Sequence, residues 1–118
     1  MERNFFYALA AVIIVAGAAL FIFATAKPAV DSTRLAQCLT EKGWTMYGTT
    51  WCPHCTAQKE TFGNESFKYV DFVDCGEKPF ECQENEIEGF PTWVNRDGSV
   101  KLVGAQALDT LASEAGCS

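Results

Sequence analysis

Basic residues are scarce in this sequence. It has 9 Lys and Arg residues against 15 Asp and Glu residues, which gives a formal net charge of -6 at pH 7. The Lys and Arg residues form no cluster along the chain. Proteins that bind nucleic acids normally carry a basic patch that neutralises phosphates. The composition therefore argues against a nucleic-acid partner.

Histidine is scarcer still, because His54 is the only residue of its type. A single histidine excludes His-rich metal sites and the paired histidines of a metalloprotease motif. Internal repeats and low-complexity stretches are also missing. With 118 residues, 48% hydrophobic and 20% charged, the chain has the composition of one small globular domain and not of a disordered tail.

Cysteine, in contrast, is abundant. Six cysteines in a short chain are typical of an oxidising compartment, where disulfides form and persist. A run without charged residues at positions 5–26 fits export from the cytoplasm. As a helix it would be about 33 Å long, enough to cross a hydrocarbon core of roughly 30 Å. Arg3 and Lys27 flank it, so the charges give almost no bias in orientation.

We interpret residues 1–27 as a membrane anchor, 28–33 as a linker and 34–118 as the domain. Ala24-Thr25-Ala26 also fits a signal-peptide cleavage site, although the run exceeds the usual hydrophobic region of about 7–15 residues. A buried core helix would need a larger protein around it. The anchor and signal interpretations both predict a domain on the extracytoplasmic side, membrane-anchored in the first case.

Patterning predicts four helices and four strands in the exported part. The expected helices cover residues 32–42, 53–62, 80–87 and 105–115, and the expected strands cover 44–48, 68–74, 91–95 and 99–103. Strands separated by helices imply parallel pairing. Arg96-Asp97-Gly98 predicts a hairpin that adds one antiparallel strand. We therefore expect an α/β fold with a four-stranded mixed sheet flanked by helices on both faces.

The candidate chemistry lies at Trp51-Cys52-Pro53-His54-Cys55. A Cys-x-x-Cys pair that opens a helix after a strand places its first sulfur where free N–H groups and the helix dipole favour an anion. The thiolate is the reactive form, and its pKa in such motifs falls to roughly 3.5–7.5. We expect Cys52 to be the exposed attacking or leaving thiol and Cys55 the shielded resolving thiol.

The two residues between these cysteines have separate expected roles. Pro53 suits the first turn of a helix. A positive or polar imidazole at His54 would favour the Cys52 thiolate, and a stabilised thiolate makes the disulfide a stronger oxidant. The alternative is that His54 is only a surface residue beside the motif.

Together with Gly89-Phe90-Pro91-Thr92, the Cys-Pro-His-Cys motif resembles the thioredoxin-like fold. The resemblance implies a cis proline at Pro91 that faces the active-site disulfide and holds substrate backbone beside it. Phe90 and Trp51 would then shape the substrate-binding surface. The histidine of the motif is similar to that of periplasmic oxidases of the DsbA type.

A more specific resemblance covers roughly residues 35–117. The chain is similar to the thioredoxin-like domain fused to bacterial and plant homologues of vitamin K epoxide reductase. The matching positions are Met46-Tyr47-Gly48, Trp51 to Cys55, Gln58-Lys59, Phe62-Gly63 and Gly89-Phe90-Pro91-Thr92-Trp93. That family passes electrons from substrate thiols to a quinone-reducing membrane domain. This chain has one candidate span, so the resemblance implies a separate quinone reductase of the vitamin K epoxide reductase or DsbB type.

Ordinary thioredoxins have a buried carboxylate six positions before the first cysteine, where this chain has Met46. This difference argues against a dedicated reductase. We expect an oxidase that introduces disulfides into exported proteins with thiols and uses no cofactor besides its own Cys52–Cys55 disulfide. The alternatives are a thiol reductase or isomerase, and a carrier that holds copper(I) between the same soft thiolates.

The other four cysteines allow three pairings, or free thiols. Cys75 and Cys82 flank a short loop, and similar loop pairs occur in the resembled family. We favour Cys75–Cys82 together with Cys38–Cys117, both as structural disulfides that restrict the unfolded chain. A zinc site shared with Cys52 and Cys55 is disfavoured, because six residues between Cys75 and Cys82 exceed the usual ligand spacing. We therefore expect no metal.

Overall fold

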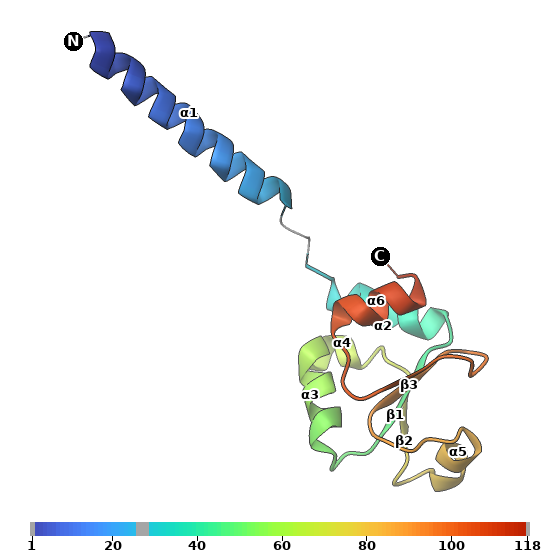
Figure 1. Cartoon of the computed structure of the whole chain (residues 1–118). Coiled ribbons are helices and arrows are strands. Elements are labelled where there is room, and N and C mark those ends of the chain that lie inside the picture. Colours follow the sequence, from blue (N-terminus) through green and yellow to red (C-terminus); the bar gives the residue numbers. More distant parts are fainter. Residues whose placement is uncertain (1, 26–28, 118) are drawn as a thin grey trace.

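The computed structural model describes residues 2–25 and 29–117, and within the first helix the side chains of residues 2–16. Helix α1 (Glu2–Thr25) lies outside the layers of the domain that follows (Figure 1). Among the described residues, no helix is both long enough and apolar enough to cross a membrane. The predicted anchor at 5–26 falls partly outside the described residues and side chains, so it stays a prediction.

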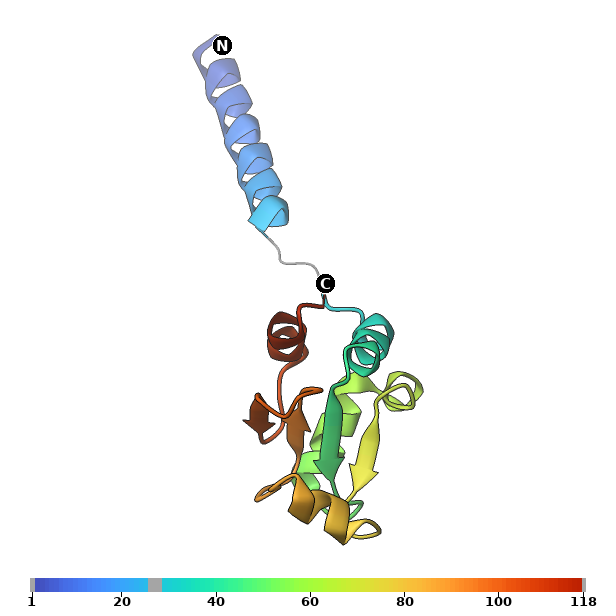
Figure 2. The same ribbon diagram turned by 90° about the vertical axis from the view of Figure 1, so that its right-hand side faces the viewer.

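The domain is built around a four-stranded mixed sheet (Figure 2). Its strands are β1 (Thr45–Gly48), β2 (Phe72–Asp74), β3 (Thr92–Val94) and β4 (Lys101–Val103), in the order β2-β1-β3-β4. Its helices are α2 (Ser32–Glu41), α3 (Pro53–Phe62), α4 (Asn64–Phe67), α5 (Pro79–Glu84) and α6 (Leu108–Ala115). Strand β1 pairs in parallel with β2 and antiparallel with β3, and β3 pairs antiparallel with β4.

Alternation along the strands divides the core between the two faces of the sheet. Met46 and Trp93 pair across β1 and β3 and pack with buried residues of α2, α3 and α6. On the other face, Tyr47 and Val73 pack with Cys82 of α5. Residues on neighbouring strands that pair directly share a face, so each face has its own helices. The predicted mixed sheet with helices on both faces is confirmed.

The direction of β3 corrects the sequence-based expectation. We expected it to be parallel to β1 and the last hairpin strand to be the antiparallel one, whereas β3 itself is antiparallel to β1. Cys75 directly follows β2 and is bridged to Cys82 in α5. This bridge holds α5 at the end of the sheet where β2 finishes, so the chain enters β3 from that same end.

The predicted strand at 68–74 is also wrong in its first half. Only Phe72–Asp74 is a strand, and it is preceded by the short helix α4, which the sequence pattern did not reveal. The backbone N–H groups of Tyr69 and Val70 close a turn onto α4. Val70 is buried in the core from this turn. Aromatic and β-branched residues favour strands, but here burial from a turn decides their conformation.

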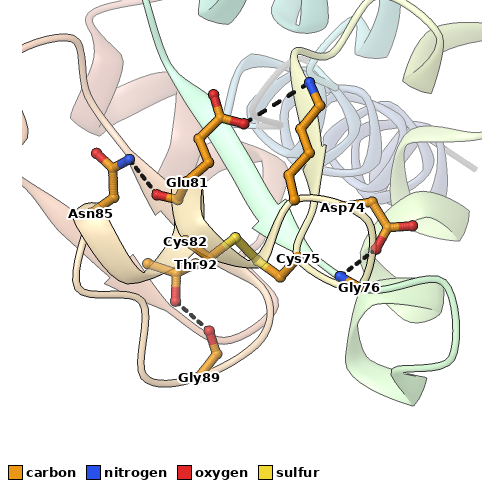
Figure 3. The surroundings of a disulfide bond; sticks show 9 residues. Asp74, Cys75, Gly76, Glu81, Cys82, Asn85, Gly89 and Thr92 are labelled. Atoms are coloured by element: carbon orange, nitrogen blue, oxygen red, sulfur yellow. Dashed lines mark hydrogen bonds and ion pairs between the residues drawn. A yellow bond between two sulfur atoms is a disulfide. The ribbon is translucent and has the colours of Figure 1, made fainter.

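The domain has one disulfide between cysteines far apart in the sequence and one between cysteines close in the sequence. Cys38 of α2 is bonded to Cys117, which follows α6, with 6.1 Å between their Cα atoms. Cys75 is bonded to Cys82, with 5.7 Å between Cα atoms (Figure 3). This is the pairing that the sequence analysis favours. Cys52 and Cys55 are present as free thiols.

Candidate active site

Cys52 is the N-cap residue of α3, directly after the turn that follows β1. Its sulfur accepts a hydrogen bond from the backbone N–H of Cys55 at 3.2 Å. Pro53 occupies the first turn, where its missing N–H costs nothing. The free N–H groups at the start of a helix would otherwise need a partner, and here the Cys52 sulfur supplies one. The Cys52 sulfur thus caps the N-terminus of α3.

These hydrogen bonds change the protonation of Cys52. Burial alone raises the pKa of the Cys52 thiol. Hydrogen bonds from the Cys55 thiol and from the backbone N–H groups of Cys55 and His54 oppose burial, and the net result is a pKa below the ordinary value of a cysteine. Hydrogen bonds to the charged form favour that form. The site therefore favours the thiolate form of Cys52.

Cys55 has the opposite preference. Its side chain is fully buried, and burial followed by its hydrogen bond to Cys52 raises the pKa of the Cys55 thiol to about 11. The backbone N–H of Thr49 and the charge of Lys59 lower this pKa in part. As predicted, Cys55 is shielded, and it holds its proton while Cys52 ionises.

The expectation that Cys52 is exposed is wrong. Its residue is only 7% exposed, because the segment around Pro91 lies against it. The Cys52 thiol is 3.7 Å from the carbonyl oxygen of Phe90, to which it can donate. The Phe90–Pro91 peptide bond is cis, as the resemblance implies. The reactive sulfur is thus covered by the backbone of the cis-proline segment.

The residues expected to bind substrate meet at this point. Trp51 is 72% exposed, and its ring makes an edge contact with the ring of Phe90, with 6.4 Å between centroids. Pro91, which directly follows Phe90, is fully buried. Trp51 and Phe90 therefore form an aromatic border beside Cys52, and the structure brings together the three residues predicted for this role.

His54 is exposed on the first turn of α3. Its backbone N–H is one of the groups that lower the pKa of Cys52. That contribution comes from the main chain, so any residue except proline would provide it. A tuning role for the imidazole ring stays a prediction.

The Cys75–Cys82 disulfide lies close to the active site. A Cβ atom placed on Gly76 would be 3.8 Å from Nε1 of Trp51, so the loop after Cys75 borders the indole. In the same region the Thr92 hydroxyl donates to the carbonyl oxygen of Gly89 at 2.7 Å (Figure 3). The Cys38–Cys117 disulfide joins α2 and α6 at the opposite end of the sheet (Figure 2).

Sequence reasoning gave no role to Gln58, which is fully buried on α3. Its Oε1 accepts hydrogen bonds from Nε1 of Trp93 at 3.1 Å and from the backbone N–H of Gln106 at 2.6 Å. Its Nε2 donates to the carbonyl oxygen of Gln106 at 3.0 Å. Gln58 thereby fixes the active-site helix to β3. Its position three residues after Cys55, on the same helix face, was the available signal.

Gly48 is a second residue for which the sequence predicted no role, although it is one of the positions that carry the family resemblance. A Cβ atom at this position would lie 2.7 Å from the Sγ of Cys55, closer than real side chains approach. Glycine at the end of β1 therefore makes room for the buried sulfur. Among the described residues, no group of three or more His, Cys, Asp and Glu side chains is arranged to hold a metal ion.

Comparison with known proteins finds a curated relative with a described activity. No family model matches the chain. The thiol-disulfide oxidoreductase LTO1 of Arabidopsis thaliana is 44% identical over 71 residues, a match that covers 53% of this chain. It covers only 19% of the length of LTO1. The likeness therefore concerns one part of a much longer protein.

Solved structures with a similar arrangement include several thioredoxins. Thioredoxin NaTrxh from Nicotiana alata has 24% identity and a TM-score of 0.48, with 60% of this chain and 67% of that chain covered. Mitochondrial thioredoxin 3 from Saccharomyces cerevisiae has 24% identity and a TM-score of 0.48, with 68% and 84% covered. The chain has an α/β fold with a four-stranded mixed sheet. Part of it is similar to part of a thiol-disulfide oxidoreductase.

Proposed function

We propose that this protein is a thiol–disulfide oxidoreductase that acts as an oxidase on exported proteins. The observation that carries the proposal is the unequal pair at the start of α3. Cys52 has a lowered pKa and lies at the N-cap, whereas Cys55 has a raised pKa and is fully buried. Such a pair has one nucleophile and one partner that closes or opens the disulfide.

The exchange transfers two electrons from a substrate dithiol to the protein. A substrate thiolate attacks the Cys52 sulfur of the Cys52–Cys55 disulfide, which forms a mixed disulfide and releases Cys55 as a thiolate. Cys55 then takes up a proton, because its pKa is raised to about 11. The second substrate thiolate attacks the substrate sulfur of the mixed disulfide. A substrate disulfide forms, and Cys52 leaves as a thiolate.

The lowered pKa of Cys52 supports the oxidising direction. A stabilised Cys52 thiolate stabilises the reduced protein, so the Cys52–Cys55 disulfide is reduced more readily and is a stronger oxidant. Met46 supports the same direction, because this fully buried residue provides no carboxylate to accept a proton from Cys55. A reductase or isomerase with the same residues is the alternative.

The proposal includes a membrane anchor at residues 5–26 and a quinone-reducing membrane protein that reoxidises the cysteine pair. The uncharged run in the sequence and the six cysteines support an extracytoplasmic site of action. Mass spectrometry of the mature protein tests the anchor. We expect an N-terminus before the run, and an N-terminus at Lys27 would show that the segment is removed.

The activity is tested with the full-length protein in a mild detergent. The protein is first oxidised and then mixed with an unfolded protein whose cysteines are reduced. We expect one substrate disulfide per Cys52–Cys55 disulfide consumed, and none from a Cys52→Ser variant. A protein that leaves these thiols unchanged, but reduces a disulfide-bonded substrate after its own reduction, would instead be a reductase.

A further inference from the structure

Lys59 lies on α3 four residues after Cys55, a spacing that places two side chains on one face of a helix. Its Nζ is 4.4 Å from the centroid of the Phe72 ring and 5.5 Å from that of Phe67. A cation over an aromatic face is attracted by the ring quadrupole. Lys59 is a partly buried residue, and its ammonium group is held over the edge strand β2.

The Cys55 sulfur lies close to the same ring. A Cβ atom on Gly48 would be 2.7 Å from the Sγ of Cys55 and 3.4 Å from Cε2 of Phe72, so both groups border one point at the end of β1. Phe72 pairs with Met46 across the strands, and Met46 is apolar and fully buried. The positive charge of Lys59 lowers the pKa of Cys55 against the larger effect of burial.

We infer that Lys59, held on Phe72, stabilises the negative charge of Cys55 whenever that thiol leaves or attacks during disulfide exchange. The biological meaning of this role rests on the proposed function. In oxidation of a substrate, the Cys52–Cys55 bond breaks and its electron pair goes to Cys55. In the reverse direction, the Cys55 thiolate attacks Cys52 in a mixed disulfide. Both steps place a negative charge inside the fold, where an opposite charge favours it.

The two cysteines thus receive different support. Hydrogen bonds at the start of α3 stabilise the Cys52 thiolate. Lys59 acts on Cys55. Lys59 consequently acts through Cys55, as a positioning residue whose charge stabilises the Cys55 thiolate. Its removal should slow the step in which Cys55 reacts and leave the step in which Cys52 reacts unchanged. This separation makes the inference testable within one reaction.

The test uses the reduced full-length protein in detergent and a symmetric aromatic disulfide, with stopped-flow detection of the coloured thiolate. Attack by Cys52 releases one aromatic thiolate and leaves the other aromatic group on Cys52. Attack by Cys55 on that mixed disulfide releases the second thiolate and closes the Cys52–Cys55 bond. Two electrons pass from the cysteine pair to the reagent, so each cysteine reports its own step.

Lys59→Met should slow the second release roughly three- to tenfold at neutral pH and leave the first unchanged. We expect an effect at the low end of the range for the loss of an opposite charge, because Lys59 is partly exposed. Lys59→Arg should restore the second release. Phe72→Leu should also slow it, because the ring no longer holds the ammonium group. The control Lys68→Met removes a lysine from an exposed ion pair with Glu65 and should change neither release.

Equal slowing of both releases by Lys59→Met would assign Lys59 to packing and overturn the inference. An unchanged second release, or failure of Lys59→Arg to restore it, would overturn it as well. The reagent is a small molecule, so both releases are measured whether or not the protein oxidises protein thiols. Failure of the proposed function would appear as intact releases without oxidation of a reduced protein substrate.

Discussion

The sulfur of Cys52 accepts a hydrogen bond from the backbone N–H of Cys55 at 3.2 Å, and the pKa values of the two thiols shift in opposite directions. The N-terminus of α3 thus stabilises a thiolate at its N-cap residue, Cys52, while the Cys55 thiol in the first turn is buried. Ionisation of the pair therefore begins at Cys52. This inequality assigns the two cysteines their separate roles in disulfide exchange.

The lowered pKa of Cys52 predicts how its alkylation depends on pH. Only the thiolate reacts, so the rate should rise with pH and level off once pH exceeds the pKa. We expect a midpoint below the ordinary cysteine value of about 8.5, with Cys55 unmodified at that pH. Mass spectrometry after brief exposure to iodoacetamide measures both sites.

A His54→Ala variant separates the ring from the main chain in the same experiment. The variant keeps the backbone N–H that lowers the pKa of Cys52. If the imidazole also tunes the thiolate, the midpoint of alkylation rises. A midpoint equal to that of the unmodified protein would restrict the effect of His54 to its main chain. In the unmodified protein, an alkylation midpoint at or above about 8.5 would contradict the lowered pKa of Cys52.

Trapping experiments should distinguish the two cysteines. A Cys55→Ser variant, mixed with a disulfide-bonded protein substrate, should accumulate a mixed disulfide at Cys52 because the resolving thiol is absent. A Cys52→Ser variant should accumulate none, since the remaining Cys55 thiol is fully buried and has a raised pKa. Non-reducing gels detect the adducts. Similar trapping by both variants would refute this division of roles.

Gln58→Met should destabilise the domain. The change removes the partners of the Trp93 indole N–H and the Gln106 backbone N–H. A buried donor left unsatisfied costs about 1–3 kcal/mol, so we expect a loss of roughly 2–3 kcal/mol in the free energy of unfolding. Chemical denaturation of the full-length protein measures it. Gln37→Met, at an exposed position of α2, is the matched control and should change stability by less than about 0.5 kcal/mol.

The Cys75–Cys82 and Cys38–Cys117 disulfides should not turn over. None of these four cysteines is the N-cap of a helix among the described elements, so none gains the stabilisation that Cys52 has. A mild reductant should open Cys52–Cys55 first, as peptide mapping would show. Cys75 or Cys82 linked to Cys52 during turnover would indicate an electron relay, which the proximity of their loop to Trp51 would then explain.

Local signals in the sequence predicted the elements that they directly punctuate. The bounds of α3 agree with the expected helix because Pro53 suits its start and Gly63 ends it. Asp31 caps α2 through its side chain, which accepts from the backbone N–H of Arg34 at 3.0 Å. The Cys-x-x-Cys motif and Pro91 likewise carried enough information to locate the candidate active site.

Features that depend on distant contacts could not be predicted in this way. The direction of β3 follows from the bridge that holds α5 at one end of the sheet. The burial of Cys52 follows from its contact with the segment around Phe90, 38 residues away. Lys59 and Gln58 have roles only because α3 packs against particular residues of β2 and β3. Residue spacing places such side chains on a face, but it does not identify what they contact.

We propose that Cys52 and Cys55 form an oxidising disulfide. The most direct test is the reduction potential of the full-length protein, equilibrated with mixtures of reduced and oxidised glutathione and quantified by the fraction of Cys52–Cys55 disulfide. His54 between the two cysteines and the absence of a carboxylate at Met46, together with the lowered pKa of Cys52, predict a potential well above that of thioredoxin, which is about -270 mV. A potential near or below about -270 mV would contradict the account and assign the protein to the reductases.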